Sequence, residues 1–155
     1  LAKKKSALRK LNEQFAHRSV KKIYLAMVEG VPTVPEATLS QWLHKDQKEK
    51  KAVVFDEPGE HRDVCQLHYW VMQYNQTKAL LEVELQTGRF HQIRAQLAAL
   101  GSPIIGDEKY GASHFAYADK GIALHARSLE FMDPQNGSTV VLKAALPIHP
   151  VWDFT

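Results

Sequence analysis

Two strand-like segments joined by a short polar turn constrain the fold of this chain most. Residues 64–74 are rich in β-branched and aromatic side chains, and apolar residues alternate with polar ones over residues 79–86. Alternation with a period of two is typical of strands that bury one face. The intervening residues Asn75–Lys78 favour a hairpin turn. The sequence therefore predicts an antiparallel strand pair within the fold.

The remaining segments extend this pair into an α+β domain. A helix is predicted over residues 1–15, and a second, short helix is predicted after residue 90 because Ile93, Leu97 and Leu100 recur at helical spacing. Further predicted strands cover residues 20–29, 38–43, 122–131 and 139–145, the last two joined by a turn at 133–137. An exposed connector is predicted at 45–51, a loop at 109–121, and a terminal segment that docks on the body at 147–155. We expect a single domain spanning residues 1–155, with a mostly antiparallel (mixed) β-sheet flanked by a few helices.

Composition limits the class of protein more than its function. The 155 residues are 45% hydrophobic and 24% charged, as in ordinary globular domains. A net charge of +3 and a pI near 9.0 are compatible with nucleic acid but do not require it. The lone Cys65 lies in a strand-like run and is expected to be a buried structural thiol. With no apolar run of membrane-spanning length and no signal-peptide pattern, we expect a cytoplasmic protein that does not contact membranes.

Three common kinds of catalytic or binding site find no support in the sequence. The eight histidines show no metal-ligand spacing, so a metal site is not expected. There is no nucleophile elbow of the hydrolase type, and no glycine-rich loop suited to a pyrophosphate. The cluster His61-Arg62-Asp63 leads directly into a predicted strand and is interpreted as a solvated turn.

The most unusual polar cluster follows the predicted strand 79–86. Residues 87–90 form the expected turn into the short helix, and His91 and Arg94, three residues apart, project from one side of that helix. Together with Arg89 they place three basic groups within six residues, which repel one another unless an anion lies among them. We expect Arg94 to hold a fixed carboxylate or phosphate. A structural ion pair is an equally good interpretation, and its candidate partners are Glu82, Glu84 and Asp107.

Several sequence blocks, in order along the chain, resemble the RluA-type (ribosomal large subunit) pseudouridine synthases. The central one is Thr87-Gly88-Arg89-Phe90-His91-Gln92-Ile93-Arg94. The others are Lys22-Ile23-Tyr24-Leu25-Ala26 with Gly30, Pro103-Ile104-Ile105-Gly106-Asp107-Glu108-Lys109-Tyr110-Gly111, and Leu124-His125-Ala126 with Leu129 and Phe131; Phe15 and Arg18 also fit. This resemblance covers nearly the whole chain.

The resemblance implies an isomerase that converts specific uridines to pseudouridine in structured RNA, with ribosomal RNA the expected substrate, and that needs neither metal nor organic cofactor. Such enzymes flip the target base out of the RNA, after which an aspartate acts on the nucleoside. By resemblance, Tyr24 packs on the target base and Ile93 forms an apolar wall of its pocket. Arg94 pairs with the catalytic aspartate and holds it ionised. Arg89 and His91, from the same block, are expected to contact substrate.

Two departures from the family pattern matter. Phe90 stands where related proteins more often have a small hydroxyl residue, and we expect it to alter packing rather than chemistry. The family's His-Arg-Leu-Asp block, which carries the nucleophile, does not occur in these residues.

The missing block suggests that the sequence is the C-terminal portion of a pseudouridine-synthase-like catalytic domain that lacks the N-terminal part. We therefore expect it to be inactive alone, with Arg94 lacking its partner. Two alternatives stay open: a catalytically inactive RNA-binding module of the same fold, and a non-RNA interaction domain in which Arg94 forms a structural pair.

Overall fold

The structure, a computed structural model, describes residues 4–17, 19–113 and 121–154. Two α-helices, seven strands and two short 3-10 helices follow one another along these residues. In order they are α1 (Lys5–Ala16), β1 (Lys21–Glu29), β2 (Glu36–Asp46), β3 (Lys51–Phe55), β4 (Asp63–Tyr74), β5 (Lys78–Leu85), α2 (Gln92–Ala99), η1 (Glu108–Tyr110), β6 (Leu124–Met132), β7 (Thr139–Lys143) and η2 (Pro150–Trp152). None of these helices is long and apolar enough to cross a membrane.

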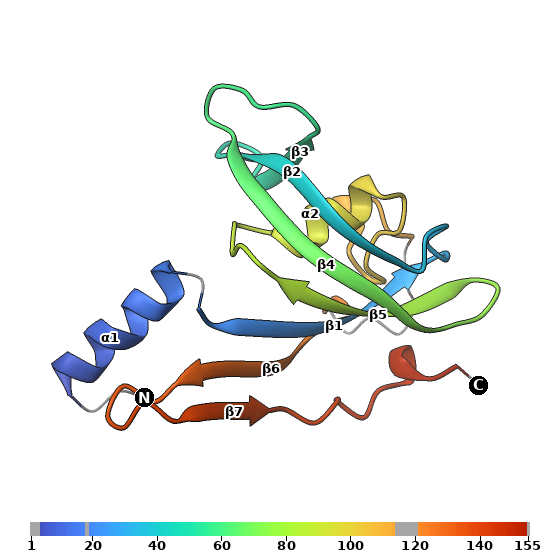
Figure 1. Cartoon of the computed structure of the whole chain (residues 1–155). Helices are drawn as coiled ribbons and strands as arrows, with labels where there is room; N and C mark the ends of the chain where they lie inside the picture. Colours follow the sequence, from blue (N-terminus) through green and yellow to red (C-terminus); the bar gives the residue numbers. More distant parts are fainter. Residues whose placement is uncertain (1–3, 18, 114–120, 155) are drawn as a thin grey trace.

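All seven strands belong to one antiparallel sheet in the order β3-β2-β4-β5-β1-β6-β7. Hairpins join β2 to β3, β4 to β5 and β6 to β7. Strand β1 instead pairs with β5 and β6, which are both distant from it in the sequence. Figure 1 shows β1 crossing the middle of the molecule while β2, β3 and β4 curl upward around α2. The predicted α+β class and the predicted hairpins are confirmed.

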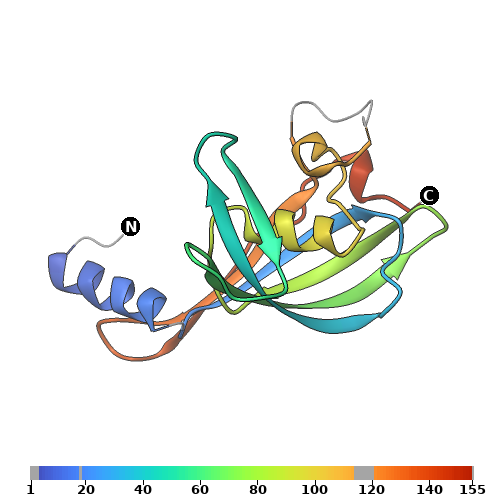
Figure 2. The same ribbon diagram turned by 90° about the horizontal axis from the view of Figure 1, so that it is seen from above.

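The alternation in β5 puts one face of the sheet into the core. Ala79, Leu81, Val83 and Leu85 are buried, and the residues between them are half-buried. Helix α2 contributes Ile93 and Leu97 to the same cluster. Figure 2 shows α2 held within the curve of the sheet, close to the β2–β3 hairpin. Because α2 is packed against the sheet, the turn that precedes it is fixed in position.

The β2–β3 hairpin corrects the prediction of an exposed connector at residues 45–51. Strand β2 continues to Asp46, β3 begins at Lys51, and only residues 47–50 form the turn. The Asp46 carboxylate orders this turn by accepting the N–H groups of Lys48 and Glu49, both at 2.9 Å. Strand β3 was missed because it is only five residues long, Lys51–Phe55, and follows a charged run. A second, smaller cluster of buried residues lies beneath this hairpin: Leu43, Ala52, Cys65, Ala95 and Tyr110.

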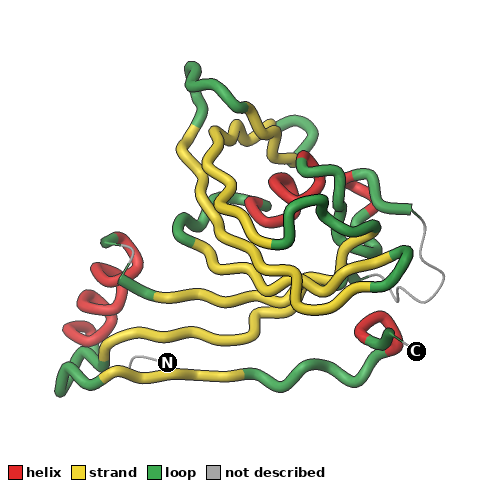
Figure 3. Tube along the Cα trace, turned by 45° about the vertical axis from the view of Figure 1, so that its right-hand side comes forward, coloured by secondary structure: helices red, strands yellow, loops and turns green. Residues whose placement is uncertain are grey.

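The ends of the described chain lie against the body in different ways. Helix α1 buries none of its residues and meets the β6–β7 turn mainly through Gln14, whose side chain exchanges two 2.8 Å hydrogen bonds with the backbone of Met132. Figure 3 shows α1 beside the far ends of β6 and β7. At the C-terminal end, Trp152 and Phe154 pack on the main core, as predicted. Arg18 and part of the predicted 109–121 loop lie outside the described residues.

Candidate functional site

The turn between β5 and α2 is organised by the buried side chain of Gln92. Its Oε1 accepts hydrogen bonds from the Thr87 hydroxyl at 2.7 Å and from the Arg89 N–H at 3.0 Å. Its Nε2 donates to the Gln66 carbonyl and to Gln96 Oε1, both at 3.0 Å. The amide therefore joins both sides of the turn to strand β4, and a fully satisfied buried network of this kind fixes a single conformation.

His91 adopts a backbone conformation that few non-glycine residues take. Its φ of 52° lies in the left-handed region, and α2 begins at the next residue. The reversal directs the His91 ring towards η1, where its Nδ1 lies 3.0 Å from the Tyr110 hydroxyl. An outlier of this kind persists only where surrounding contacts hold it, which is common at functional sites.

Arg94 is held by Asp107 through a two-point ion pair. Its Nε donates to Oδ2 at 2.7 Å and its Nη2 to Oδ1 at 2.8 Å. Asp107 is 1% exposed, whereas the Arg94 side chain keeps 19% of its surface accessible. The hydrogen bond to Asp107 raises the pKa of Arg94 further above its usual value. Asp107, one of the structural partners considered from the sequence, is therefore paired with Arg94. The partner that was expected to be missing is a different residue, the catalytic aspartate of the family.

The hydrogen bonds around His91 determine its protonation state. Arg94 Nη1 lies 2.9 Å from His91 Nε2 and can only donate, so Nε2 must be the unprotonated acceptor. The proton then sits on Nδ1, which donates to the Tyr110 hydroxyl. Burial, followed by the charges of Arg94 and Lys109, lowers the pKa of His91 below 6.5, which agrees with a neutral ring. His91, Arg94, Asp107 and Tyr110 thus form one connected group.

The predicted site residues do not all converge on this group. His91 and Arg94 come together as the helical spacing predicted. Arg89 turns towards the start of β4, where its Nε donates to the Val64 carbonyl at 3.3 Å and its Nη2 lies 3.8 Å from Asp63. It therefore lies apart from the Arg94 ion pair.

The two apolar predictions, Tyr24 and Ile93, both lie on the core side of the sheet. Ile93 is 4% exposed and packs within the main cluster. Tyr24 pairs with the buried Val83 across the β1–β5 ladder, so both side chains lie on the face that α2 covers. The ladder between β1 and β6 shifts register at Ile23 and Tyr24, the kind of irregularity that re-aims a side chain.

Two contributors to the site were not singled out from the sequence. Tyr110 accepts from both His91 and the Ala52 N–H, the latter at 2.8 Å, and so ties the site to β3. Lys45, from the predicted connector, places its Nζ 4.7 Å from the centre of the Phe90 ring. The only feature of the sequence that pointed to Tyr110 was its place in one of the blocks that resemble the family. Lys45 could not be found because its position depends on the length of β2.

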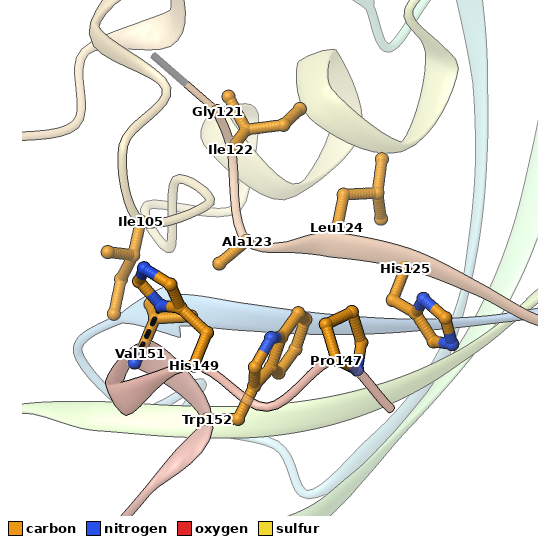
Figure 4. Close-up of a pocket in the computed structure, with 10 residues that line it drawn as sticks. All are labelled: Ile105, Gly121, Ile122, Ala123, Leu124, His125, Pro147, His149, Val151 and Trp152. Atoms are coloured by element: carbon orange, nitrogen blue, oxygen red, sulfur yellow. Dashed lines mark hydrogen bonds between the residues drawn. The ribbon is translucent and has the colours of Figure 1, made fainter. Parts of the chain in front are cut away.

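An apolar cavity of about 240 Å³ lies elsewhere in the molecule, between the start of β6 and the C-terminal segment. Figure 4 shows His125, His149 and Trp152 among its lining residues. The His149 ring already makes a hydrogen bond within its own segment, because its Nδ1 accepts the Val151 N–H at 3.1 Å. None of the predicted site residues lines this cavity, so we place the candidate site at the Arg94 group.

Metal-ligand clusters and a reactive thiol are also not found in the part of the chain that the structure describes. No group of three or more His, Cys, Asp or Glu side chains there could hold a metal ion. Burial raises the pKa of Cys65 to about 11, so its thiol stays protonated at neutral pH, in keeping with a structural role. The His61-Arg62-Asp63 segment lies at an exposed turn where Arg62 stacks over Phe55, as expected of a solvated turn.

Comparison with known proteins agrees with the blocks found in the sequence. Residues 1–99 match the RNA pseudouridylate synthase family. An uncharacterized RNA pseudouridine synthase of Chlorobaculum parvum is 34% identical over 95% of this chain and 50% of its own length. Ribosomal large subunit pseudouridine synthase C of Buchnera aphidicola is 31% identical over 94% of this chain and 48% of its own length.

A solved structure shares the fold. Human RNA pseudouridylate synthase domain containing 1 superimposes with a TM-score of 0.78 at 24% identity, covering 98% of this chain and 65% of the human chain. The chain spans about half the length of the curated relatives it matches. On the family match and these relatives together, the chain belongs to the RNA pseudouridylate synthase family.

Proposed function

We propose that the protein of which this chain is part isomerises specific uridines to pseudouridine in structured RNA, with ribosomal RNA as its substrate. Family membership supports the reaction, and the name of the Buchnera relative supports the RNA class. The nucleophilic aspartate is not in a matching block of these 155 residues and would come from the rest of the protein. The chain alone is expected to show no turnover.

The observation that carries this proposal is the geometry of the Arg94 guanidinium. It has five N–H groups, and Asp107 and His91 take up three of them. Among the residues that the structure describes, the other two have no hydrogen-bond partner and can receive a second carboxylate, and 19% of the side chain is accessible. Asp107 holds the guanidinium in one orientation, so little rotamer entropy is lost when a second carboxylate binds. That carboxylate would be the nucleophile, kept ionised by the neighbouring cation.

Tyr24 and Ile93 have supporting roles in this proposal. Tyr24 lies on the α2 side of the sheet, at the point where the β1–β6 register shifts. A flipped uracil would pack against the Tyr24 ring there. Ile93 is buried in the core cluster against which Tyr24 packs, and it contributes to the apolar surface there. Arg89 and His91 contact the RNA or position the residues that do. The cytoplasmic location expected from the sequence stays a prediction.

The same ion pair also supports a second candidate, an inactive RNA-binding module of the same fold. Arg94 already has a carboxylate partner, so the Asp107 pair can be purely structural. A module of this kind binds structured RNA with the steep salt dependence of several neutralised phosphates, but it does not turn over.

Tritium release from RNA carrying 5-tritiated uridine separates the two candidates. We expect the full-length protein to release tritium and Arg94→Met to abolish release. Arg9→Met serves as the matched control, because Arg9 lies on α1 with 77% of its side chain exposed. RNA binding without release by the full-length protein would support the inactive module, and release by Arg94→Met at the normal rate would contradict the role of Arg94.

A further inference from the structure

Phe90 is the most exposed aromatic ring at the candidate site. It is 38% exposed, although it lies directly next to the turn network that fixes His91. Burying such a ring is worth a few kcal/mol in general, so a partner that covers the exposed part of Phe90 gains from the contact. Its environment indicates which kind of partner that is.

One face of the Phe90 ring is covered within the protein. The His91 ring stacks on it with centroids 3.8 Å apart and an angle of 20° between the planes. His91 is itself held by Tyr110 and Arg94, so the Phe90 ring rests on a fixed support. The exposed Lys45 also places its ammonium over the Phe90 ring, 4.7 Å from the ring centre.

The surroundings of the ring are strongly basic. Lys51 lies 5.1 Å from the centre of the Tyr110 ring, and Arg94 lies 4.9 Å from the same centre. Lys109 is close enough to His91 to contribute to lowering its pKa. Rings and cations therefore alternate across this surface, from β2 and β3 to the turn before α2.

An aromatic face flanked by lysines suits an unpaired nucleotide. Proteins that bind single-stranded nucleic acid combine base stacking on aromatic rings with cations that follow the phosphates. Lys45 can leave the ring and pair with a phosphate when a base takes its place, because the lysine is long and its head group is in solvent. An apolar protein partner would instead leave several lysines to be desolvated without anions.

We propose that the face of the Phe90 ring directed away from His91 stacks an unpaired nucleobase of the RNA substrate, next to the target uridine, while Lys45 binds the adjacent phosphate. This inference rests on the proposed function and deepens it, since it assigns a base-stacking position beside the Arg94 group. Phe90 is then a specificity residue and takes no part in the chemistry.

Fluorescence of 2-aminopurine in a short single-stranded oligoribonucleotide tests the stacking directly. The full-length protein is expected to quench the fluorophore on binding and Phe90→Trp to quench it at least as strongly. Phe90→Leu should lose the quenching and bind about tenfold more weakly, within the range of one lost base–aromatic stack. Tyr74→Leu is the control, since Tyr74 is 66% exposed at the far end of β4.

Salt dependence tests the lysine. Lys45→Gln should reduce the slope of log K against log salt by about one, whereas Phe90→Leu leaves the slope unchanged. Wild-type affinity and quenching in Phe90→Leu would overturn the stacking inference, and an unchanged slope in Lys45→Gln would overturn the phosphate contact.

Tritium release keeps this inference separable from the proposed function. With ribosomal RNA as substrate, Phe90→Leu should raise KM and leave kcat near the wild-type value. If the wild-type protein releases no tritium but still quenches 2-aminopurine through Phe90, the proposed function fails and the stacking surface stands. If release is normal and Phe90→Leu alters neither KM nor quenching, the stacking inference alone fails.

Discussion

At the scale of single residues, the pair between Arg94 and Asp107 shows where sequence reasoning reaches its limit. A cation among buried neighbours requires an anion, so a fixed partner for Arg94 could be predicted. The choice among Glu82, Glu84 and Asp107 could not, because it depends on how the segment after α2 folds back. The two glutamates lie at half-buried positions of β5, and Lys21 pairs with Glu84 at 3.3 Å.

Replacing Asp107 should destabilise the chain strongly. Asp107→Asn keeps the shape but leaves the Arg94 charge without its counter-ion, at an expected cost of about 3 kcal/mol in the free energy of unfolding. The estimate takes the low end of the usual range because the Arg94 side chain is 19% exposed. Urea unfolding measures the change. Glu13→Gln, which removes an exposed pair with Arg9 on α1, is the control and should cost under about 0.5 kcal/mol. Equal losses of unfolding free energy in the two variants would mean that the buried pair stabilises the chain no more than the exposed pair does.

The neutral state of His91 predicts a dependence of stability on pH. Because the pKa of His91 is lowered in the folded chain, the unfolded chain binds the proton more readily. The contribution of His91 is therefore fully present above the unfolded pKa of about 6.5 and is lost as the pH falls from there towards the lowered folded value. His91→Asn removes the titrating group and keeps a residue that tolerates the left-handed conformation.

Unfolding free energies of the two proteins, measured from pH 7.5 to pH 5, test this dependence. The wild type should lose more stability than His91→Asn over this interval, although the variant starts lower because its ring contacts are gone. Parallel curves would show that His91 keeps an ordinary pKa in the folded chain.

At the scale of elements, the turn before α2 depends on an amide network that periodicity cannot reveal. The switch from strand to helix near residues 87–90 was predicted correctly from the change in apolar spacing. Gln92 and Gln96, at 2% and 0% exposure, looked like ordinary polar helix positions. They are buried because α2 sits within the curve of the sheet, and sheet curvature is not encoded in any local pattern. For the same reason, β3 and the true length of β2 could not be predicted.

Gln92→Met should loosen this turn without unfolding the domain. The side chains are similar in volume, but the Thr87 hydroxyl and the Arg89 N–H lose their acceptor at a cost of about 1–3 kcal/mol. We expect the Arg89 amide to exchange its hydrogen faster in the variant. The amides of the central strands β4 and β5 should still exchange only through global unfolding. Gln73→Met on β4, at an exposed position, is the control. Unchanged exchange at Arg89 would contradict a structural role for the Gln92 amide.

At the scale of the whole molecule, the resemblance predicted more than the physical patterns did. Strand alternation and turn residues gave the class and most strands, but not the order of the strands in the sheet. That order places β1 between β5 and β6, and such long-range pairing follows from the shape of the complete sheet. The central family block placed His91 and Arg94 in one expected site, whereas only the three-dimensional arrangement identified Asp107 as the partner of Arg94 and joined Phe90 to Lys45.

The central position of β1 has a consequence for the order of folding. Strands β2 to β5 can form from neighbouring hairpins, but β1 must wait for β5, about fifty residues away, and for β6, about a hundred residues away. We therefore expect the transition state for folding to contain the β2–β5 meander while β1 is still unpaired. Val28→Ala in β1 should then mainly speed unfolding, and Leu67→Ala in β4 should mainly slow folding, in stopped-flow measurements. Of these seven strands, the one that is made first would be the one that docks last, so a growing chain exposes the apolar face of β1 until β5 and β6 have been made.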